Sequence, residues 1–181
     1  MRKIPILVLI LVFLALFASA KPESVMSGPY LVSFDMGNSN HSTTTPASEE
    51  RETTSGHPYT RYSVDIGGTN GKASILIDDD VGQMKNFSVE DEVKASLDTT
   101  LGGCGKPIIA TRIIIDGNPG VVGFIMCPYG SLAVIRYPLD YSPENKTIKT
   151  RVGIISTYPW NEGTSILVKT IHVEKVDSSI R

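Results

Sequence analysis

Two runs of alternating apolar and polar residues on either side of a glycine-rich break restrict the fold most. In "YTRYSVDI" the residues Tyr62, Val64 and Ile66 fall on one face, and "KASILI" repeats the pattern over residues 72–77. A period of two is typical of half-buried β-strands. The break, Gly67–Gly71, contains Asn-Gly, a dipeptide typical of hairpin turns because both residues tolerate positive φ. The segment therefore predicts an antiparallel hairpin.

The same break resembles the first phosphate loop of sugar kinases in the hexokinase and actin ATPase superfamily. The resemblance rests on "DIGGTN" (residues 65–70) followed by Lys72. In that family the aspartate, here Asp65, helps to hold a metal, and backbone amides face phosphate. No second phosphate loop is visible, and "LGGCGKP" fails as one because Pro107 replaces the Ser/Thr that would hold magnesium. The hairpin is the favoured interpretation, and an extracellular enzyme that uses Asp65 and this loop is the alternative.

Other apolar runs predict further strands. "PIIATRIIID", "VVGFIMC" and "SLAVIRYPL" are separated only by the turn formers of residues 117–120 and 128–130, which predicts a meander. A short first strand is expected in "GPYLVSFDMG" (residues 28–37) and a later one in "TIKTRVGIISTYP" (residues 147–159). The polar run from Asn38 to Pro58 has almost nothing to bury and predicts a loop or linker.

"FSVEDEVKASLDTTLGG" has the clearest helical pattern. Ser88 can cap it, and Glu90 is placed to pair with Lys94. Its apolar stripe consists of Val89, Val93, Leu97 and Leu101. The tail, residues 161–175, is open to two interpretations: a strand by its β-branched content, or a helix capped by Asn161.

These patterns predict an α+β fold: an antiparallel sheet of six to seven strands covered by one main helix and a short C-terminal helix. The expected organisation is a signal peptide at 1–20, a short strand plus a polar Ser/Thr-rich loop at 21–58, a single α+β domain at 59–176 and a tail at 177–181.

The N-terminal segment has the three parts of a secretory signal peptide. Arg2 and Lys3 are positive, Ile4–Phe17 is an apolar run of 14 residues, and small residues follow. The run is shorter than the roughly 20 residues that a spanning helix needs. We expect cleavage between Ala20 and Lys21 and a secreted or cell-surface protein. An uncleaved anchor is the alternative.

The cysteines and sequons fit that setting. Cys104 and Cys127 form an even pair, which outside the cell favours a disulfide over two free thiols or a reactive cysteine. Asn40, Asn86 and Asn145 each begin an Asn-X-Ser/Thr sequon and are possible glycosylation sites.

Charge and motif content argue against several classes of function. Without the leader, 15 basic and 19 acidic side chains remain with no basic stripe, so nucleic acid is a poor candidate partner. The three histidines are scattered, which gives no zinc spacing, and Asp78–Asp80 reads as an exposed acidic turn rather than a calcium loop. We identify no catalytic, cofactor-binding or metal-binding residues. The expected function is a non-catalytic, monomeric domain that binds a protein, glycan or envelope component.

The order of elements resembles the PsbP-like fold, in particular small secreted archaeal proteins. The resemblance rests on "FSVED" (residues 87–91), "IDGNPG" (residues 115–120) and the closing "ILVKTIHVEK" (residues 166–175), and it spans Pro58 to Lys175. It implies an antiparallel sheet covered by helices, a helical closing segment, and a role in binding or assembly without catalytic residues.

Overall fold

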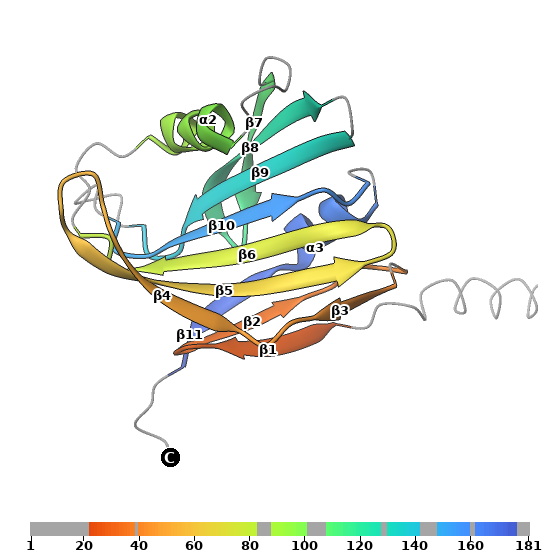
Figure 1. Ribbon diagram of the computed structural model, residues 1–181, viewed down its shortest axis with the longest axis horizontal. Helices are drawn as coiled ribbons and strands as arrows, with labels where there is room; N and C mark the ends of the chain where they lie inside the picture. The colour runs from red at the N-terminus through yellow and green to blue at the C-terminus, as the bar shows by residue number, and fades with distance from the viewer. Residues whose placement is uncertain are drawn as a thin grey trace, which may run out of the picture.

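A computed structural model of the chain describes residues 22–38, 40–82, 88–100, 108–127, 130–141, 148–159 and 162–176. This part of the chain forms two antiparallel sheets and two short helices, arranged as in Figure 1. The strands are β1 (Glu23–Ser27), β2 (Tyr30–Phe34), β3 (His41–Thr43), β4 (Ala47–Glu52), β5 (Pro58–Gly68), β6 (Gly71–Asp79), β7 (Ile108–Ile115), β8 (Asn118–Cys127), β9 (Gly130–Pro138), β10 (Arg151–Ser156) and β11 (His172–Lys175). The helices are α2 (Val89–Thr100) and α3 (Gly163–Thr170).

The large sheet has eight strands. Seven follow the order β3-β5-β6-β10-β9-β8-β7, and β4 pairs with β5 beside β3. The small sheet has the order β1-β2-β11.

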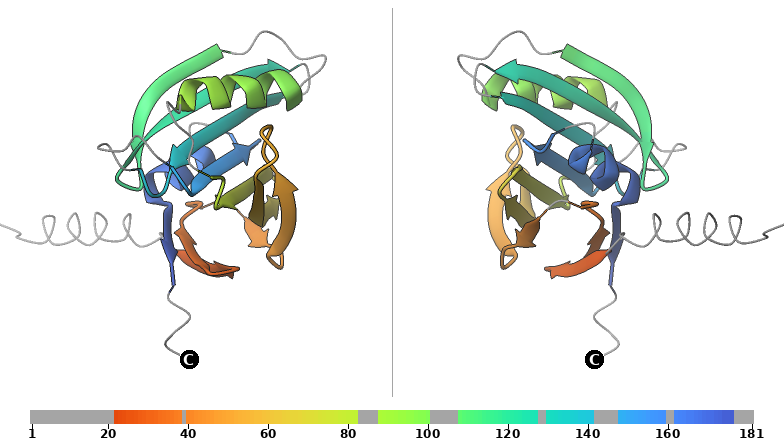
Figure 2. Two further views of the ribbon diagram at one scale, coloured as in Figure 1. Left: turned by 90° about the vertical axis from the view of Figure 1, so that its left-hand side faces the viewer. Right: turned by 90° about the vertical axis from the view of Figure 1, so that its right-hand side faces the viewer.

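The expected fold class is wrong, because the chain is mostly β with only short helices. The inner face of the large sheet is covered by the small sheet and α3, which share one apolar core with it. Helix α2 packs on the other face, over β7, β8 and β9 (Figure 2). The sequence predicts one sheet covered by a main helix. The structure instead has two sheets that face each other, and the main helix, α2, lies on the outer face of the large sheet.

The polar run from Asn38 to Pro58, expected to be a loop, contains β3 and β4. Both strands pair with the same edge of β5, β3 near the hairpin and β4 at the other end. Every residue of β4 is exposed, so its composition carries no burial signal. Strand β4 is held by backbone hydrogen bonds to β5, and amino-acid composition gives no information about such bonds.

The predicted first strand is shorter than expected and is preceded by another. Residues 28–37 contain β2, and β1 comes before it across a turn in which Gly28 has φ 60°. The ring of Tyr62 fills the space where a side chain at Gly28 would lie, so this turn requires glycine for two reasons.

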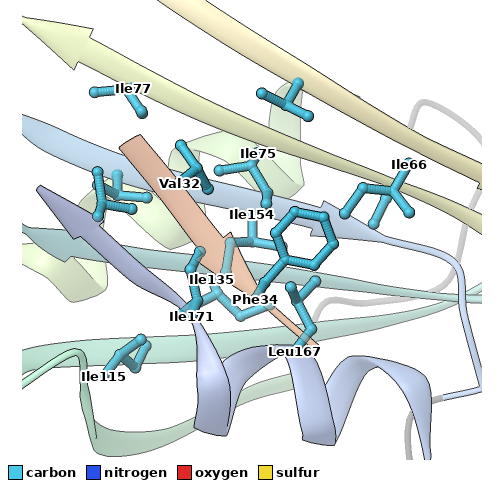
Figure 3. Packing of buried hydrophobic residues seen from close by; sticks show 14 of the residues in the cluster. Val32, Phe34, Ile66, Ile75, Ile77, Ile115, Ile135, Ile154, Leu167 and Ile171 are labelled. Atoms are coloured by element: carbon cyan, nitrogen blue, oxygen red, sulfur yellow. The ribbon is translucent and has the colours of Figure 1, made fainter. Parts of the chain in front are cut away.

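The core lies between the two sheets and follows the predicted alternation. Val64 and Ile66 of β5 are buried, and Tyr62 packs against the same cluster. Figure 3 shows Val32 and Phe34 of β2 packed against isoleucines of the large sheet and against Leu167 of α3. Other core residues are Ala73, Ile75, Ile77, Ile135, Val152, Ile154, Ile171 and Val173.

Helix α2 forms where the sequence predicts it. The Ser88 hydroxyl accepts a hydrogen bond from the Asp91 amide at 3.2 Å, which confirms the N-cap. Val93 and Leu97 are buried, and a side chain at Gly123 of β8 would meet Val93 Cγ1 at 2.5 Å. Leu101 lies outside the described residues. The expected pairing of Glu90 with Lys94 is replaced by an ion pair between Glu90 and Arg112 of β7, 2.5 Å long.

The predicted meander is also present, and residues 162–175 are described as well. The β7–β8 turn is Asp116-Gly117, with φ of 52° and 74°, which matches the twist of a hairpin. The ambiguous tail contains both elements, helix α3 followed by strand β11. No helix in the described ranges is long and apolar enough to cross a membrane.

Candidate functional sites

The glycine-rich break is a two-residue hairpin loop. Gly68 pairs with Gly71, and Thr69-Asn70 link β5 to β6. Asn70 does not have positive φ, so the reason given for the Asn-Gly signal is wrong. Two of the three glycines, Gly68 and Gly71, are needed for packing instead. A side chain at Gly68 would clash with the carbonyl oxygen of Asn40.

Asp65 lies on the outer face of the large sheet, three residues before the end of β5. Its Oδ1 accepts a hydrogen bond from the Ser74 hydroxyl at 2.6 Å, across the β5–β6 pair. Its backbone oxygen accepts one from the Thr44 amide at 2.8 Å. In the described part of the chain no three His, Cys, Asp or Glu side chains come together as a metal site. Asp65 is therefore placed to form a hydrogen bond across two strands.

Four residues before Asp65 on β5, the strand register lines up a ladder of alternating charges across the outer face. Glu49 of β4 lies opposite Arg61 of β5, Arg61 opposite Asp78 of β6, and Asp78 opposite Arg151 of β10. Arg61 Nε donates to Asp78 Oδ1 at 2.6 Å, and Arg151 Nε donates to Asp78 Oδ2 at 2.7 Å. Arg151 Nη1 also donates to Glu92 Oε2 of α2 at 3.0 Å. The ladder therefore ties the helix to the sheet.

Asp78 is the centre of the ladder, and its side chain is 5% exposed. Burial raises the pKa of Asp78, but the hydrogen bond from Arg61 and the charges of Arg151 and Arg61 outweigh burial, so the net pKa lies below its ordinary value. Tyr59 lies about equally near both guanidinium groups, 5.9 Å from Arg61 Cζ and 5.8 Å from Arg151 Cζ. Arg136 of β9 is close by, and burial lowers its pKa to about 10.

This cluster corrects the expectation of an exposed acidic turn at Asp78–Asp80. Asp78 is buried in the ladder, and Asp79 pairs with Lys175 Nζ at 3.0 Å. Only Asp80, with φ 56°, keeps a largely exposed side chain. Charged residues occur in β5, β6 and β10, but the sequence alone does not show that Arg61, Asp78 and Arg151 lie opposite one another.

A groove of about 350 Å³ runs beside the ladder on the outer face of β4, β5, β6 and β10. Its lining is mixed: small or apolar residues and hydroxyl, carboxylate and guanidinium groups. The lining residues are Ala47, Ser48, Glu49, Arg51, Arg61, Ser63, Asp65, Ser74, Leu76 and Ile155.

The other end of the large sheet carries a second groove, about 600 Å³ in volume, between β7 and the start of α2. Its walls are mainly apolar, with the Glu90–Arg112 ion pair at one side. The apolar lining consists of Val89, Ile113, Ile114, Pro119, Val121, Pro138 and Tyr141. Among the described strands, β7 pairs only with β8. Within the described residues no strand pairs with the other edge of β7, and the groove lies over the neighbouring face of β7, β8 and the end of β9.

Of the other site residues expected from the sequence, Asn40 and Cys127 lie within the described residues. Asn40 is exposed just before β3. Cys127 ends β8, but its expected partner Cys104 lies outside the described residues, so the disulfide stays a prediction. Also outside them are Ala20, Lys21, Asn86 and Asn145.

No family model matches the chain, and comparison with curated proteins and with solved structures found no similar protein. The PsbP-like resemblance therefore stays a prediction that rests on its short motifs.

Proposed function

We propose that the chain is an extracytoplasmic, non-catalytic domain that binds a partner protein by pairing an extended segment of it with strand β7. The observation that carries this proposal is the difference between the two edges of the large sheet. The β4 edge carries several charged side chains, which disfavour pairing, whereas β7 is mainly apolar and pairs on one side only among the described strands.

The β4 edge has the features of a protected edge. All six residues of β4 are exposed, and its last four are Glu49, Glu50, Arg51 and Glu52. Charged side chains on an edge strand disfavour pairing with another chain. Strand β7 has weaker protection within the described residues: one charged residue, Arg112, and a register irregularity between Ile109 and Arg112.

Strand β7 reads "IIATRIII", with one charged residue in eight. Ile114 is 72% exposed, the highest value among the exposed large apolar side chains in the described ranges. An open edge with exposed β-branched residues favours the addition of a strand, since backbone hydrogen bonds supply affinity and pockets for alternate side chains supply specificity.

The groove beside β7 defines the chemistry of the partner. Because strand side chains alternate, a segment paired with β7 would direct every second side chain to the same face of the sheet as this groove, whose lining includes Ile114 of β7 and Val89 of α2. The Glu90–Arg112 pair at the rim can contact polar groups that flank the segment. The partner segment is therefore extended and carries apolar residues at alternate positions.

The extracytoplasmic setting is supported by the leader pattern of residues 1–20. In that setting, the proteins available to pair with the apolar edge of β7 are envelope or extracellular proteins.

Panning of phage-displayed random peptides against the secreted protein tests the proposal. We expect enrichment of peptides with alternating apolar and β-branched residues. Binding of a selected peptide should weaken about tenfold or more in an Ile114→Glu variant, equivalent to at least about 1.4 kcal/mol, because the new charge lies on the docking edge. The matched control is Met26→Glu, which places the same charge at an exposed apolar residue of β1 that is 43% exposed.

Equal binding by wild type and Ile114→Glu, or equal loss in the Met26→Glu control, would refute docking at β7. Analytical ultracentrifugation of the protein without peptide tests whether a second copy of the chain pairs with β7 instead. A dimer that Ile114→Glu dissociates would show that β7 pairs with a second copy of the chain instead of with another protein.

A further inference from the structure

The polar groove on the outer face, at the end of the large sheet opposite to β7, has the features of a ligand site. Its long axis crosses strands, because the lining residues come from β4, β5, β6 and β10. Ala47, Ser63 and Leu76 are successive partners in the register and form the floor. Ile155 lies opposite Ser74 and extends the apolar part of the floor.

The charged side chains of this groove form hydrogen bonds within the protein. Arg61 donates Nε and Nη2 to Asp78, at 2.6 and 2.9 Å. Asp65 accepts from Ser74, and Arg51 Nε donates to Glu49 at 2.9 Å. A guanidinium has five N–H donors and a carboxylate about four acceptor positions, so these groups have further capacity for hydrogen bonds. Fixed polar groups lose little conformational entropy when a ligand binds.

The charges that line the groove cancel. Glu49 and Asp65 are negative, and Arg51 and Arg61 are positive. A phosphate or another strong anion would need a positive excess, and a cation would need a negative one. The lining instead offers donors and acceptors in close alternation, which suits a neutral ligand rich in hydroxyl groups.

We propose that this groove is a binding site for a neutral saccharide. The ring hydroxyls bond to Asp65, Glu49 and the two arginines, and the C–H face of the ring packs on Leu76 and Ile155. The volume of about 350 Å³ is at the small end for ligand pockets and suits a single ring or a chain end.

Saturation-transfer NMR with neutral monosaccharides tests this site, with glucuronate and glucosamine as anionic and cationic probes of the same ring. We expect transfer to at least one neutral sugar and weaker transfer to both charged ones. A matched pair of variants in β4 locates the site. Glu49 lines the groove, whereas Glu50, the next residue, accepts from Thr60 at 2.9 Å and is not part of the lining.

Glu49→Gln should weaken sugar binding about tenfold, the effect of losing a charged hydrogen-bond acceptor, and Glu50→Gln should leave it unchanged. Urea unfolding of both variants checks that each is folded. Three results would overturn the proposal: no transfer to any neutral sugar, preference for a charged probe, or binding that Glu49→Gln does not alter. Each is independent of peptide binding at β7.

Discussion

A Cβ atom at Gly71 would lie 2.9 Å from the Cα of Tyr158 and 3.0 Å from its nitrogen. The β5–β6 hairpin loop therefore packs against the chain that leaves β10, and Gly71, with φ 156°, is the residue that permits the contact. A glycine-rich sequence that resembles a phosphate loop is explained by packing.

Replacing Gly71 with alanine should destabilise the protein by about 1 to 3 kcal/mol, because the added methyl group meets backbone that cannot move away. Gly67→Ala is the matched control. A Cβ there meets nothing within 4 Å, so its effect should stay within about 0.5 kcal/mol. Urea unfolding measures both. Equal effects of the two substitutions would contradict the packing explanation.

Asp65→Asn should change the free energy of unfolding by less than about 0.5 kcal/mol, because asparagine keeps an oxygen that can accept from Ser74 at a largely exposed position. Isothermal titration should detect no ATP binding by wild type or variant, since the charges around Asp65 leave no positive excess for phosphates. Saturable ATP binding that Asp65→Asn abolishes would favour the kinase-like alternative.

Asp78→Asn should destabilise the protein by about 3 to 5 kcal/mol at pH 7, because it leaves buried arginines without their counter-charge. The pKa of Asp78 is lowered in the folded state. Its contribution is therefore present above the unfolded-state pKa of about 3.9 and is lost as pH falls through the folded-state value.

Urea unfolding between pH 7 and pH 2 should thus show the difference between wild type and Asp78→Asn shrinking at the acid end. Asp80→Asn is the control, since Asp80 is largely exposed and Asn tolerates its positive φ. A pH-independent difference for Asp78→Asn would contradict the ladder.

His172 provides a second pH-dependent contact, between the β7–β8 turn and the last strand. Its Nδ1 lies 2.6 Å from Asp116 Oδ1, and Asp116 Oδ2 accepts from the Val173 amide at 2.9 Å. The hydrogen bond to Asp116 raises the pKa of His172. This stabilisation is present below the unfolded-state pKa of about 6.5 and is lost as pH rises through the folded-state value.

The effect of His172→Gln should therefore be larger at pH 5.5 than at pH 8.5, and smaller than about 1 kcal/mol because the imidazole is largely exposed. In an Asp116→Asn background the pH dependence should shrink, because only Glu174, whose Oε2 lies 3.8 Å from His172 Nε2, would still favour the charged imidazole. An unchanged pH dependence would show that Asp116 is not its main source.

The elements that the sequence predicted are those with local signals. The alternation in β5 and β6, the Ser88 cap of α2 and the short turns of the meander each depend on neighbouring residues. The pairing of β2 with β11 in the small sheet has no such signal, because it joins Val32 to Val173. That pairing connects the two ends of the chain and can be found only from the tertiary structure.

The candidate sites were missed for a similar reason. Asp65 was noted for its resemblance to a phosphate loop, but Arg61, Asp78 and Arg151 become neighbours only through strand register. The open edge of β7 depends on strand order, which the apolar run of residues 108–115 does not specify. Periodicity predicted that this run is a strand, and not that it lies at the end of the sheet.

Hydrogen exchange at the backbone amides of β7, with and without a selected peptide, tests the central claim most directly. Alternate amides of an edge strand point outward, and strand addition would bond them. We predict at least about tenfold slower exchange at alternate β7 residues, consistent with added backbone hydrogen bonds, and no change in β4. A bound peptide that leaves exchange in β7 unchanged, or that protects β4 or α3 instead, would contradict the claim.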